Sequence, residues 1–480
     1  MRIGISVKGL LVSTALVLSA CAGVPHGGAG PELAPIASFA DTQSFAAPPT
    51  DWPSDRWWDA YRDAQLTALI DEALKGSPTL AQAEARLRQA DAQVTQSGAA
   101  LLPSVDASGQ VSETEQSRVA GFPAFIQQLL PQGYQPNGRL ALDLTFDLDL
   151  FGKNRAALAA QVSEAQATQA DLAEARLTLS TAIAGAYADL MRLGAERDAA
   201  AEAVRNRAET ARLTSMRVEN GLDTRAELKQ AEAATPSSQA DVESLDEQIL
   251  LTRHRLAALM GEGPDRGLAI TMPTAETVKP FGLPADLRLH LVARRPDIVA
   301  ARLRAEEAAK RIDVAYAQFF PDVSLTGFFG QQSLGLSQLF NPAAAIGSIG
   351  PTVTLPIFEG GRLRGQYHGA KSDYAAAVDA YDATLTQALQ DVADAAASVQ
   401  SAARQLADRR AALAAGEQAY AVAQERYEGG LSSFVSVLAA EDALIDERRA
   451  FADARSRVFS LDITLIHALG GGYAHAPSQS

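Results

Sequence analysis

The chain has 480 residues, of which 47% are hydrophobic and only 6% aromatic, and its formal net charge is -15. Such an acidic balance argues against nucleic acid as a partner, because nucleic-acid-binding surfaces are basic. The scarcity of aromatic residues and the abundance of alanine favour close-packed helices over a globular core built from large side chains.

Residues 1–20 have the features of a secretory signal peptide. Arg2 and Lys8 supply positive charge, and residues 10–20 form an apolar run too short to span a bilayer. The run ends in L-S-A-C, and Cys21 is the only cysteine of the chain. This order resembles the lipobox of bacterial lipoproteins, which implies cleavage before Cys21 and its acylation. The alternative is a soluble export signal that happens to end in a cysteine.

No later segment reaches about 18 uninterrupted apolar residues, so any further crossing of a membrane has to use strands. Residues 21–55 are rich in proline, glycine, alanine and serine, and they predict an extended tether behind the lipid anchor.

The rest of the sequence consists of two related copies, residues 56–260 and 284–470, with a linker at 261–283 and a tail at 471–480. Pro103 recurs as Pro321, a displacement of 218, and Gly221 recurs as Gly430, a displacement of 209. The displacement changes because the first copy has a longer insertion near residues 121–134, which we expect to be a surface loop. Each copy predicts a helix, two strands, a long helix, a turn and a return helix, so we expect one internally duplicated architecture.

Alternating polar and apolar residues predict two strands in each copy. The four segments are 105–111, 139–150, 323–329 and 349–358. A strand turns alternate side chains to opposite faces, so each has one apolar and one polar face. Strands of about nine to eleven residues are long enough to cross a membrane.

The long helices are predicted by an apolar residue at every seventh position. From residue 362 to residue 426 there is no proline, and the repeat begins at Val378, Leu385 and Val392 and continues to Tyr427. Such a repeat is typical of a left-handed coiled coil. The return helix of the second copy has the same period, whereas Pro236 predicts a kink or a break in that of the first.

A barrel in a membrane has to close, because hydrocarbon offers no partner for unpaired backbone groups. The smallest such barrels have about eight strands, so the four strands of one chain cannot close. Two chains would make a barrel filled by side chains, whereas three would leave water inside. We therefore expect the chain to assemble with copies of itself.

The chain resembles outer-membrane factors of the TolC and OprM type, and most closely the lipoprotein branch often called the NodT family. The matching segments cover nearly all of the mature chain: W-W-D-A-Y-R-D-A-Q-L-T-A-L-I-D-E-A-L from Trp57, T-F-D-L-D-L-F-G-K from Thr145, G-L-P-A-D-L from Gly282, A-R-R-P-D-I from Ala293, F-F-P-D-V-S-L-T-G from Phe319, P-I-F-E-G-G-R from Pro356, R-Y-E-G-G-L-S-S from Arg426 and A-L-G-G-G from Ala468.

This resemblance implies an α+β membrane protein in a Gram-negative outer membrane. Three chains would share a 12-stranded β-barrel, four strands per chain, continuous with a long periplasmic coiled-coil α-barrel. The implied function is the outer-membrane channel of a tripartite efflux pump, a passive exit duct for small molecules. The implied partners are a periplasmic adaptor (membrane fusion protein), an inner-membrane transporter of the RND type and outer-membrane lipid.

The resemblance also implies roles for the two helix turns. In the family these turns form the periplasmic tip, which contacts the adaptor and closes the channel. The matching residues are Arg217, Gly221, Leu222, Arg426, Tyr427, Gly430 and Leu431. Relatives place an apolar residue and an aspartate just after the second turn, where this chain has Val435 and Ala439. We therefore take Val435, with the nearby acids Glu441 and Asp442, as a possible gate; the alternative is that these acids are solvated on a helix surface.

The polar face of residues 139–150 includes three aspartates, Asp143, Asp147 and Asp149, while Leu140 to Leu150 at the even positions would meet lipid. We expect the aspartates to line the barrel lumen and to favour cations if they are unpaired, or simply to keep the lumen wet.

We expect Trp57 and Trp58 to pack an N-terminal segment against the helices, and not to mark a membrane interface. The six histidines form no zinc-protease motif, and a single cysteine cannot build a zinc site, so we expect no enzyme activity and no cofactor or metal. The alternative to a duct is a lipid-anchored coiled-coil or adhesin stalk without a pore, but a stalk has no use for two pairs of alternating strands.

Overall fold

The computed structural model describes residues 30–39, 49–115, 117, 133–273, 282–284 and 287–474, the side chains of Pro49 and of residues 288–290 excepted. The predicted signal peptide, Cys21 and much of the tether lie outside the described residues. So do most of the predicted loop at 121–134, part of the linker and the end of the tail.

The chain divides into two compact units. One comprises Met1–Leu33, Arg88–Ala167 and Arg302–Ala380, and the other comprises Ala34–Leu87, Thr168–Ala301 and Tyr381–Ser480. Four helices have residues in both units: α3 (Pro78–Ala99), α5 (Lys153–Glu219), α9 (Pro296–Ala317) and α10 (Arg362–Glu428).

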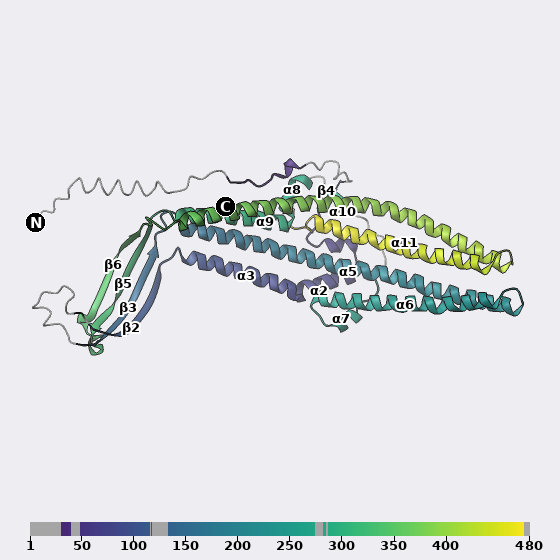
Figure 1. The fold of residues 1–480 in the computed structure, drawn as a ribbon, viewed down its shortest axis with the longest axis horizontal. Helices are drawn as coiled ribbons and strands as arrows, with labels where there is room; N and C mark the ends of the chain where they lie inside the picture. The colour runs from purple at the N-terminus through teal and green to yellow at the C-terminus, as the bar shows by residue number, and fades with distance from the viewer. Residues whose placement is uncertain are drawn as a thin grey trace, which may run out of the picture. The chain divides into compact units, whose positions relative to one another are not determined.

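The first unit contains an antiparallel sheet of four strands (Figure 1). The strands are β2 (Ser104–Thr114), β3 (Gln135–Asp147), β5 (Asp322–Leu334) and β6 (Ala345–Thr354), in the order β2-β3-β5-β6. Each copy therefore supplies one hairpin, and the two hairpins meet where β3 pairs with β5. The outer sides of β2 and β6 are the edges of this sheet.

One face of the sheet is apolar and exposed. The register places Val105 opposite Leu144, Leu144 opposite Gly327 and Gly327 opposite Ile349, so these residues share a face. Its exposed large side chains are Val105, Val111, Leu140, Leu142, Phe329, Ile349 and Val353. The predicted alternation is confirmed, and an exposed apolar face of this extent marks an interface.

Two strands end earlier than their alternation predicts. β3 ends at Asp147 instead of residue 150, because Asp149 adopts a left-handed backbone with φ of 45° and its carboxylate binds the first turn of α5. β6 ends at Thr354 instead of residue 358. Pro356 lies just beyond this end and has no N–H to donate to a ladder.

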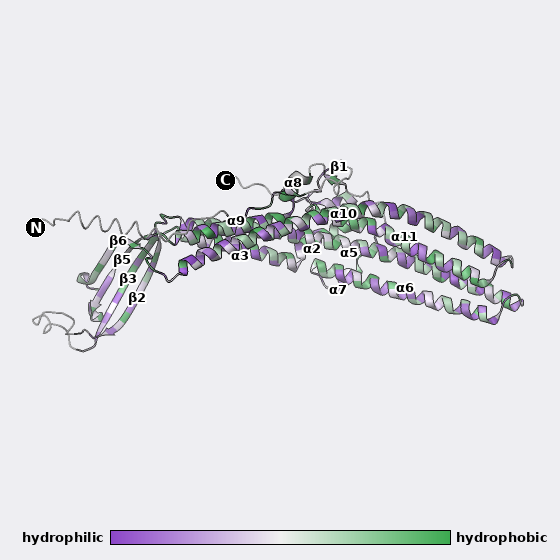
Figure 2. Ribbon diagram, turned by 45° about the horizontal axis from the view of Figure 1, so that its top comes forward, coloured by the Kyte–Doolittle hydropathy of each residue, from purple (hydrophilic) through white to green (hydrophobic). Residues whose placement is uncertain are grey.

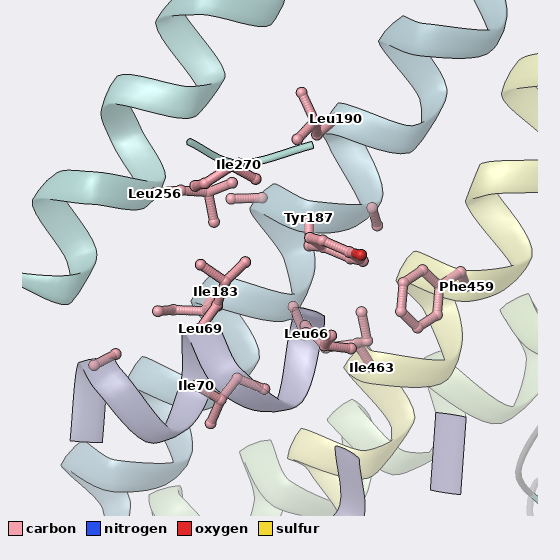
Figure 3. Close-up of a cluster of buried hydrophobic side chains, with 14 of the residues drawn as sticks. Leu66, Leu69, Ile70, Ile183, Tyr187, Leu190, Leu256, Ile270, Phe459 and Ile463 are labelled. Carbon is pink, nitrogen blue, oxygen red and sulfur yellow. The ribbon is translucent and has the colours of Figure 1, made fainter. Parts of the chain in front are cut away.

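The second unit has its core around α2 (Ala64–Gly76) (Figure 3). Leu66, Leu69 and Ile70 of α2 pack against Ile183, Tyr187 and Leu190 of α5. α6 (Arg225–Met260) adds Leu256, and α11 (Phe434–Ala468) adds Phe459 and Ile463. Trp57 and Trp58, in a short 3-10 helix at Trp57–Tyr61, are 2% and 4% exposed and belong to the same core, so their predicted packing role is confirmed.

Each copy ends in a helix hairpin, in which α6 returns beside α5 and α11 beside α10 (Figure 1). α5 and α10 both have 67 residues. Of the predicted seven-residue repeat, Val378, Leu385 and Val392 are buried, and so is Tyr427. Hydrophobic and hydrophilic residues alternate in bands along these helices (Figure 2). Within the described ranges, no helix is long and apolar enough to cross a membrane.

Of the kink or break predicted at Pro236, the break does not occur: α6 continues through this residue from Arg225 to Met260.

Shorter elements complete the second unit. A two-residue β1 (Pro49–Thr50) pairs in parallel with β4 (Leu283–Pro284), and α7 (Pro264–Leu268) and α8 (Leu287–Arg294) lie in and after the linker. Between α8 and α9, the buried Arg295 donates to Asp297 at 2.6 Å and to Asp391 of α10 at 3.0 Å. Gly470 has φ of 87°, and a Cβ there would lie 2.0 Å from the carbonyl oxygen of Arg294. Two of the motifs that carry the resemblance, A-R-R-P-D-I and A-L-G-G-G, therefore pack on each other.

Candidate functional site at the two helix turns

The two turns that end α5 and α10 have the same backbone. Gly221 and Gly430 have φ of 73° and 72°, a left-handed conformation that suits glycine. The next residue in each turn donates its N–H five residues back, from Leu222 to Arg217 at 2.8 Å and from Leu431 to Arg426 at 2.7 Å. Both helices therefore end in the same glycine-based cap, which satisfies carbonyl groups at the helix end.

The side chains at the two turns differ in their surroundings. Leu222 and Leu431 are exposed apolar residues, at 64% and 73%. Arg426 is exposed as well, whereas the side chain of Arg217 is only 14% exposed. Each turn thus exposes a leucine, whereas only the second turn also exposes its arginine, because Arg217 of the first is largely buried.

A polar cluster joins the two helix hairpins at the turns. Tyr427, on α10, donates its hydroxyl hydrogen to the carboxylate of Asp223 in the first turn. Its hydroxyl lies 3.2 Å from that of Thr214 on α5. Arg217 donates to Asp223 at 2.9 Å and to the carbonyl of Tyr427 at 3.1 Å, and its guanidinium lies 4.5 Å from the centre of the Tyr427 ring. Tyr427 is therefore held from several sides by residues of the other hairpin.

This cluster is shielded from water. Tyr427 is 1% exposed, and its ring lies 6.1 Å from that of Phe434 on α11. Burial, and then its bond to Asp223, raise the pKa of the Tyr427 hydroxyl to about 12. The hydrogen bond to Asp223 raises the pKa of the Arg217 guanidinium. At neutral pH the cluster thus has a neutral tyrosine and a buried arginine, which strengthens its hydrogen bonds because little water competes.

The residues considered for a gate are in three different environments on α11. Val435 is 58% exposed. Asp442 accepts a bond from Arg207 of α5 at 2.7 Å. Glu441 is 1% exposed, and neither oxygen of its carboxyl group has a hydrogen-bond partner among the residues that the structure describes. Burial raises the pKa of the Glu441 carboxyl to about 7. Glu441 is thus not on a solvated helix surface, and Asp442 is tied to a neighbouring helix.

All three aspartates of the predicted lumen have a cationic neighbour. Asp143 accepts from Arg139 at 3.1 Å and from Ser108 at 2.6 Å. A carboxylate oxygen of Asp147 lies 3.3 Å from the amine of Lys153.

Asp149 lies beyond the strand, and its buried carboxylate accepts the N–H groups of Asn154 and Arg155 and the guanidinium of Arg155. The unpaired state on which the expected cation preference depended is therefore not found, because each carboxylate has a partner.

Sequence reasoning missed Asp223, which accepts hydrogen bonds from Tyr427 and Arg217, and Thr214, whose hydroxyl contacts that of Tyr427. The second turn has Ser432 where the first has Asp223, a displacement of 209, so comparing the copies would have singled out this acid. Thr214 gives no such signal, because a threonine inside a helix is ordinarily a surface residue.

Comparison with known proteins supports the resemblance to outer-membrane factors that the sequence motifs indicated. The profile of the outer membrane efflux protein family matches residues 69–262 and 289–471. The crystal structure of the outer membrane protein VceC from Vibrio cholerae is 41% identical and covers 88% of this chain and 100% of its own, with a TM-score of 0.82.

Two curated relatives are similar over much of their length. The fusaric acid resistance protein FusA of Burkholderia cepacia is 34% identical over 381 residues, 75% of this chain and 68% of that protein. The multidrug resistance outer membrane protein MdtP of Escherichia coli K12 is 28% identical over 481 residues, 98% of this chain and 96% of that protein.

These matches confirm the expected fold class, outer-membrane location and transport function. The fold is that of the trimeric outer-membrane efflux channels, which combine a helical barrel with a β-domain and have a large periplasmic part. The chain belongs to the outer membrane efflux protein family and is the outer-membrane channel component of an efflux pump.

Proposed function

We propose that three copies of this chain form a passive exit duct that is closed at rest by the polar cluster at the helix turns. The observation that carries this proposal is the position of Tyr427, which is buried on one hairpin and bonded to Asp223, Thr214 and Arg217 of the other. The hairpins cannot separate at the turns without exposing or breaking these bonds. Each such bond to a charged group contributes about 1.5–3 kcal/mol, which is enough to bias a gate.

The exposed ends of the turns are suited to a periplasmic adaptor. Leu222 and Leu431 offer apolar contacts, and the second turn adds the exposed Arg426, a residue type that is enriched at protein interfaces. We propose that the adaptor binds here and draws the hairpins apart, and that it couples the duct to an inner-membrane transporter of the RND type. The duct itself then needs no energy source and no catalytic group.

We also propose that Cys21 anchors the mature chain in the outer membrane through its acyl chains. The signal at 1–20, the tether at 21–55, the repeats at 56–260 and 284–470, the linker at 261–283 and the tail at 471–480 remain our proposed division of the chain. The L-S-A-C order supports the anchor. Mass spectrometry of the mature protein tests it: we expect an acylated N-terminal Cys21, and a free cysteine would rule the anchor out.

Conductance in a planar bilayer tests the closed duct. We expect purified wild-type trimers to conduct weakly, and the Tyr427→Phe variant to conduct several times more, because the variant keeps the ring but loses the bonds to Asp223 and Thr214. Mass in detergent checks that both are trimers. The matched control is Lys229→Gln, which breaks the exposed pair between Lys229 and Glu232 within the first hairpin and leaves the cluster intact. Monomeric protein, or equal conductance of the wild type and Tyr427→Phe, would contradict the proposal.

A further inference from the structure

The four-stranded sheet has two edges that need a partner in a membrane. Among the described residues, β2 and β6 each pair on one side only, and the backbone groups of their other sides would be left unsatisfied in hydrocarbon. The proposed trimer supplies a second copy of this chain as the partner, so that β6 of one chain meets β2 of the next. The trimer alone does not say which residues lie opposite each other, and an antiparallel pair can slip by two residues without changing its faces.

The internal duplication can be tested as a guide to strand register within one chain. β2 and β5 are displaced by 218, as Pro103 and Pro321 show, and β3 and β6 follow the displacement of 209 between the starts of α5 and α10, Lys153 and Arg362. Moving the pair Ser104 and Thr145 of the first hairpin by these amounts gives Asp322 and Thr354. This is the pair that the second hairpin contains. The β2–β3 and β5–β6 hairpins therefore have the same strand register, with no slip between them.

The same displacements relate the β3–β5 pair, which joins the two copies within a chain, to a β6–β2 pair between neighbouring chains. In the closed barrel, β6 meets the next β2 as β3 meets β5 within a chain. We propose that β6 and β2 of neighbouring chains pair in the register that the β3–β5 junction dictates. Thr145 opposite Thr326 becomes Thr354 opposite Ser108 of the partner subunit, and Leu144 opposite Gly327 becomes Val353 opposite Gly109 of the partner subunit.

The side chains at these positions agree with the register. The first pair places two hydroxyl residues opposite each other in both junctions, and the second places a branched apolar residue opposite a glycine in both. A slip by two residues would place Thr354 opposite Asp106 or Gln110 of the partner subunit.

Disulfide cross-linking of the full-length trimer tests the register, which rests on the proposed trimer. The in-register variants are Ser108→Cys with Thr354→Cys, and Gly109→Cys with Val353→Cys. Two adjacent pairs are used because closely and widely spaced pairs alternate in an antiparallel ladder, with Cα separations of about 4.5 and 5.5 Å. The slipped controls combine Thr354→Cys with Asp106→Cys or with Gln110→Cys, and each single variant controls for Cys21.

With a membrane-permeable oxidant, we expect at least one in-register variant to form covalent dimers and trimers about tenfold faster than either slipped control. Faster cross-linking of a slipped pair, or no cross-linking of either in-register pair in an intact trimer, overturns the register while the duct stands. If the wild type and the variants with one introduced cysteine are monomeric by mass in detergent, the proposed function itself is overturned.

Discussion

The two helix hairpins place glutamates at equivalent positions in opposite environments. Glu232 on α6 and Glu441 on α11 are equivalent, displaced by 209 like the glycines of the turns. The side chain of Glu232 is 46% exposed and pairs with Lys229 at 2.5 Å. Glu441 is buried, and its carboxyl group has no hydrogen-bond partner in the described part of the chain. A backbone can therefore be duplicated while the side chains acquire different tasks.

The turns differ in the same way. Arg217 and Asp223 of the first turn are buried partners, whereas their equivalents Arg426 and Ser432 do not form such a pair. The second hairpin contributes Tyr427 instead, at a position where the first has Val218. One copy thus supplies the charged acceptor and the other supplies the donor. The difference shows how a duplicated hairpin can bind its own counterpart.

Removing the acceptor should have the largest effect. In Asp223→Ala, Arg217 and the hydroxyl of Tyr427 lose a buried partner, and breaking such a pair costs about 3–5 kcal/mol. We expect amide hydrogen exchange around the two turns to accelerate by at least about a hundredfold, because the turns open locally. Exchange measured by mass spectrometry on the trimer, peptide by peptide, checks this.

The equivalent substitution in the second turn, Ser432→Ala, is the matched control. It removes a hydroxyl that has no hydrogen-bond partner within the described ranges, so we expect exchange within about threefold of the wild type. Similar acceleration in both variants would mean that the Asp223 pair of the first turn does not hold the two turns closed.

The second prediction uses the two glutamates. Glu441 faces Arg207 of α5, Asp442 of α11 and Tyr420 of α10, and burial raises its pKa from 4.5 to about 7. The folded state therefore holds a proton that the unfolded state releases between pH 4.5 and 7. Stability due to this group is complete below pH 4.5 and is lost as the pH rises to about 7. In Glu441→Gln this loss disappears, so we expect a higher Tm than wild type at pH 8, by about 3 °C, and an equal Tm at pH 4.5.

Glu232→Gln is the control for this titration. Its carboxylate is exposed and already paired with Lys229, so the substitution should leave the difference in Tm between pH 4.5 and pH 8 as it is in the wild type. If Glu441→Gln has the same pH dependence as the wild type, the carboxyl group of Glu441 is not protonated in the folded channel.

Much of the fold could be predicted from the sequence, because strands and long helices each require apolar residues at a regular spacing. The alternation of residues 139–150 and the seven-residue repeat from Val378 are local patterns, and they placed the strands and the long helices. The end of β3 was predicted three residues too late, because the strand stops where Asp149 caps a helix, and alternation does not encode such a cap.

The cluster at the turns was predicted only in part. Gly221 and Gly430 could be predicted because the left-handed backbone of the turns requires glycine, and Leu222 and Leu431 directly follow them in the sequence. The partnership of Tyr427 with Asp223 joins residues 204 positions apart, and no local pattern signals it. The burial of Glu441 was hidden for the same reason: an acid on a helix is usually solvated, and only the packing of three helices makes this one an exception.

The last and smallest predicted effect concerns the sheet, where the copies differ in charge. Arg139, Asp143 and Asp147 of β3 correspond to uncharged residues of the second copy, Ser348, Thr352 and Pro356. Because Arg139 pairs with Asp143 at 3.1 Å, the two charges largely cancel.

Arg139→Gln would leave three uncompensated carboxylates in the trimer, and we expect the cation-over-anion permeability ratio to rise by about twofold. Reversal potentials in a salt gradient measure this ratio, with Arg139→Lys as the control that keeps the charge. An unchanged ratio would place these aspartates away from the path of the ions, whereas a rise confined to the glutamine variant would place the polar face of β3 on the lumen and its apolar face on lipid.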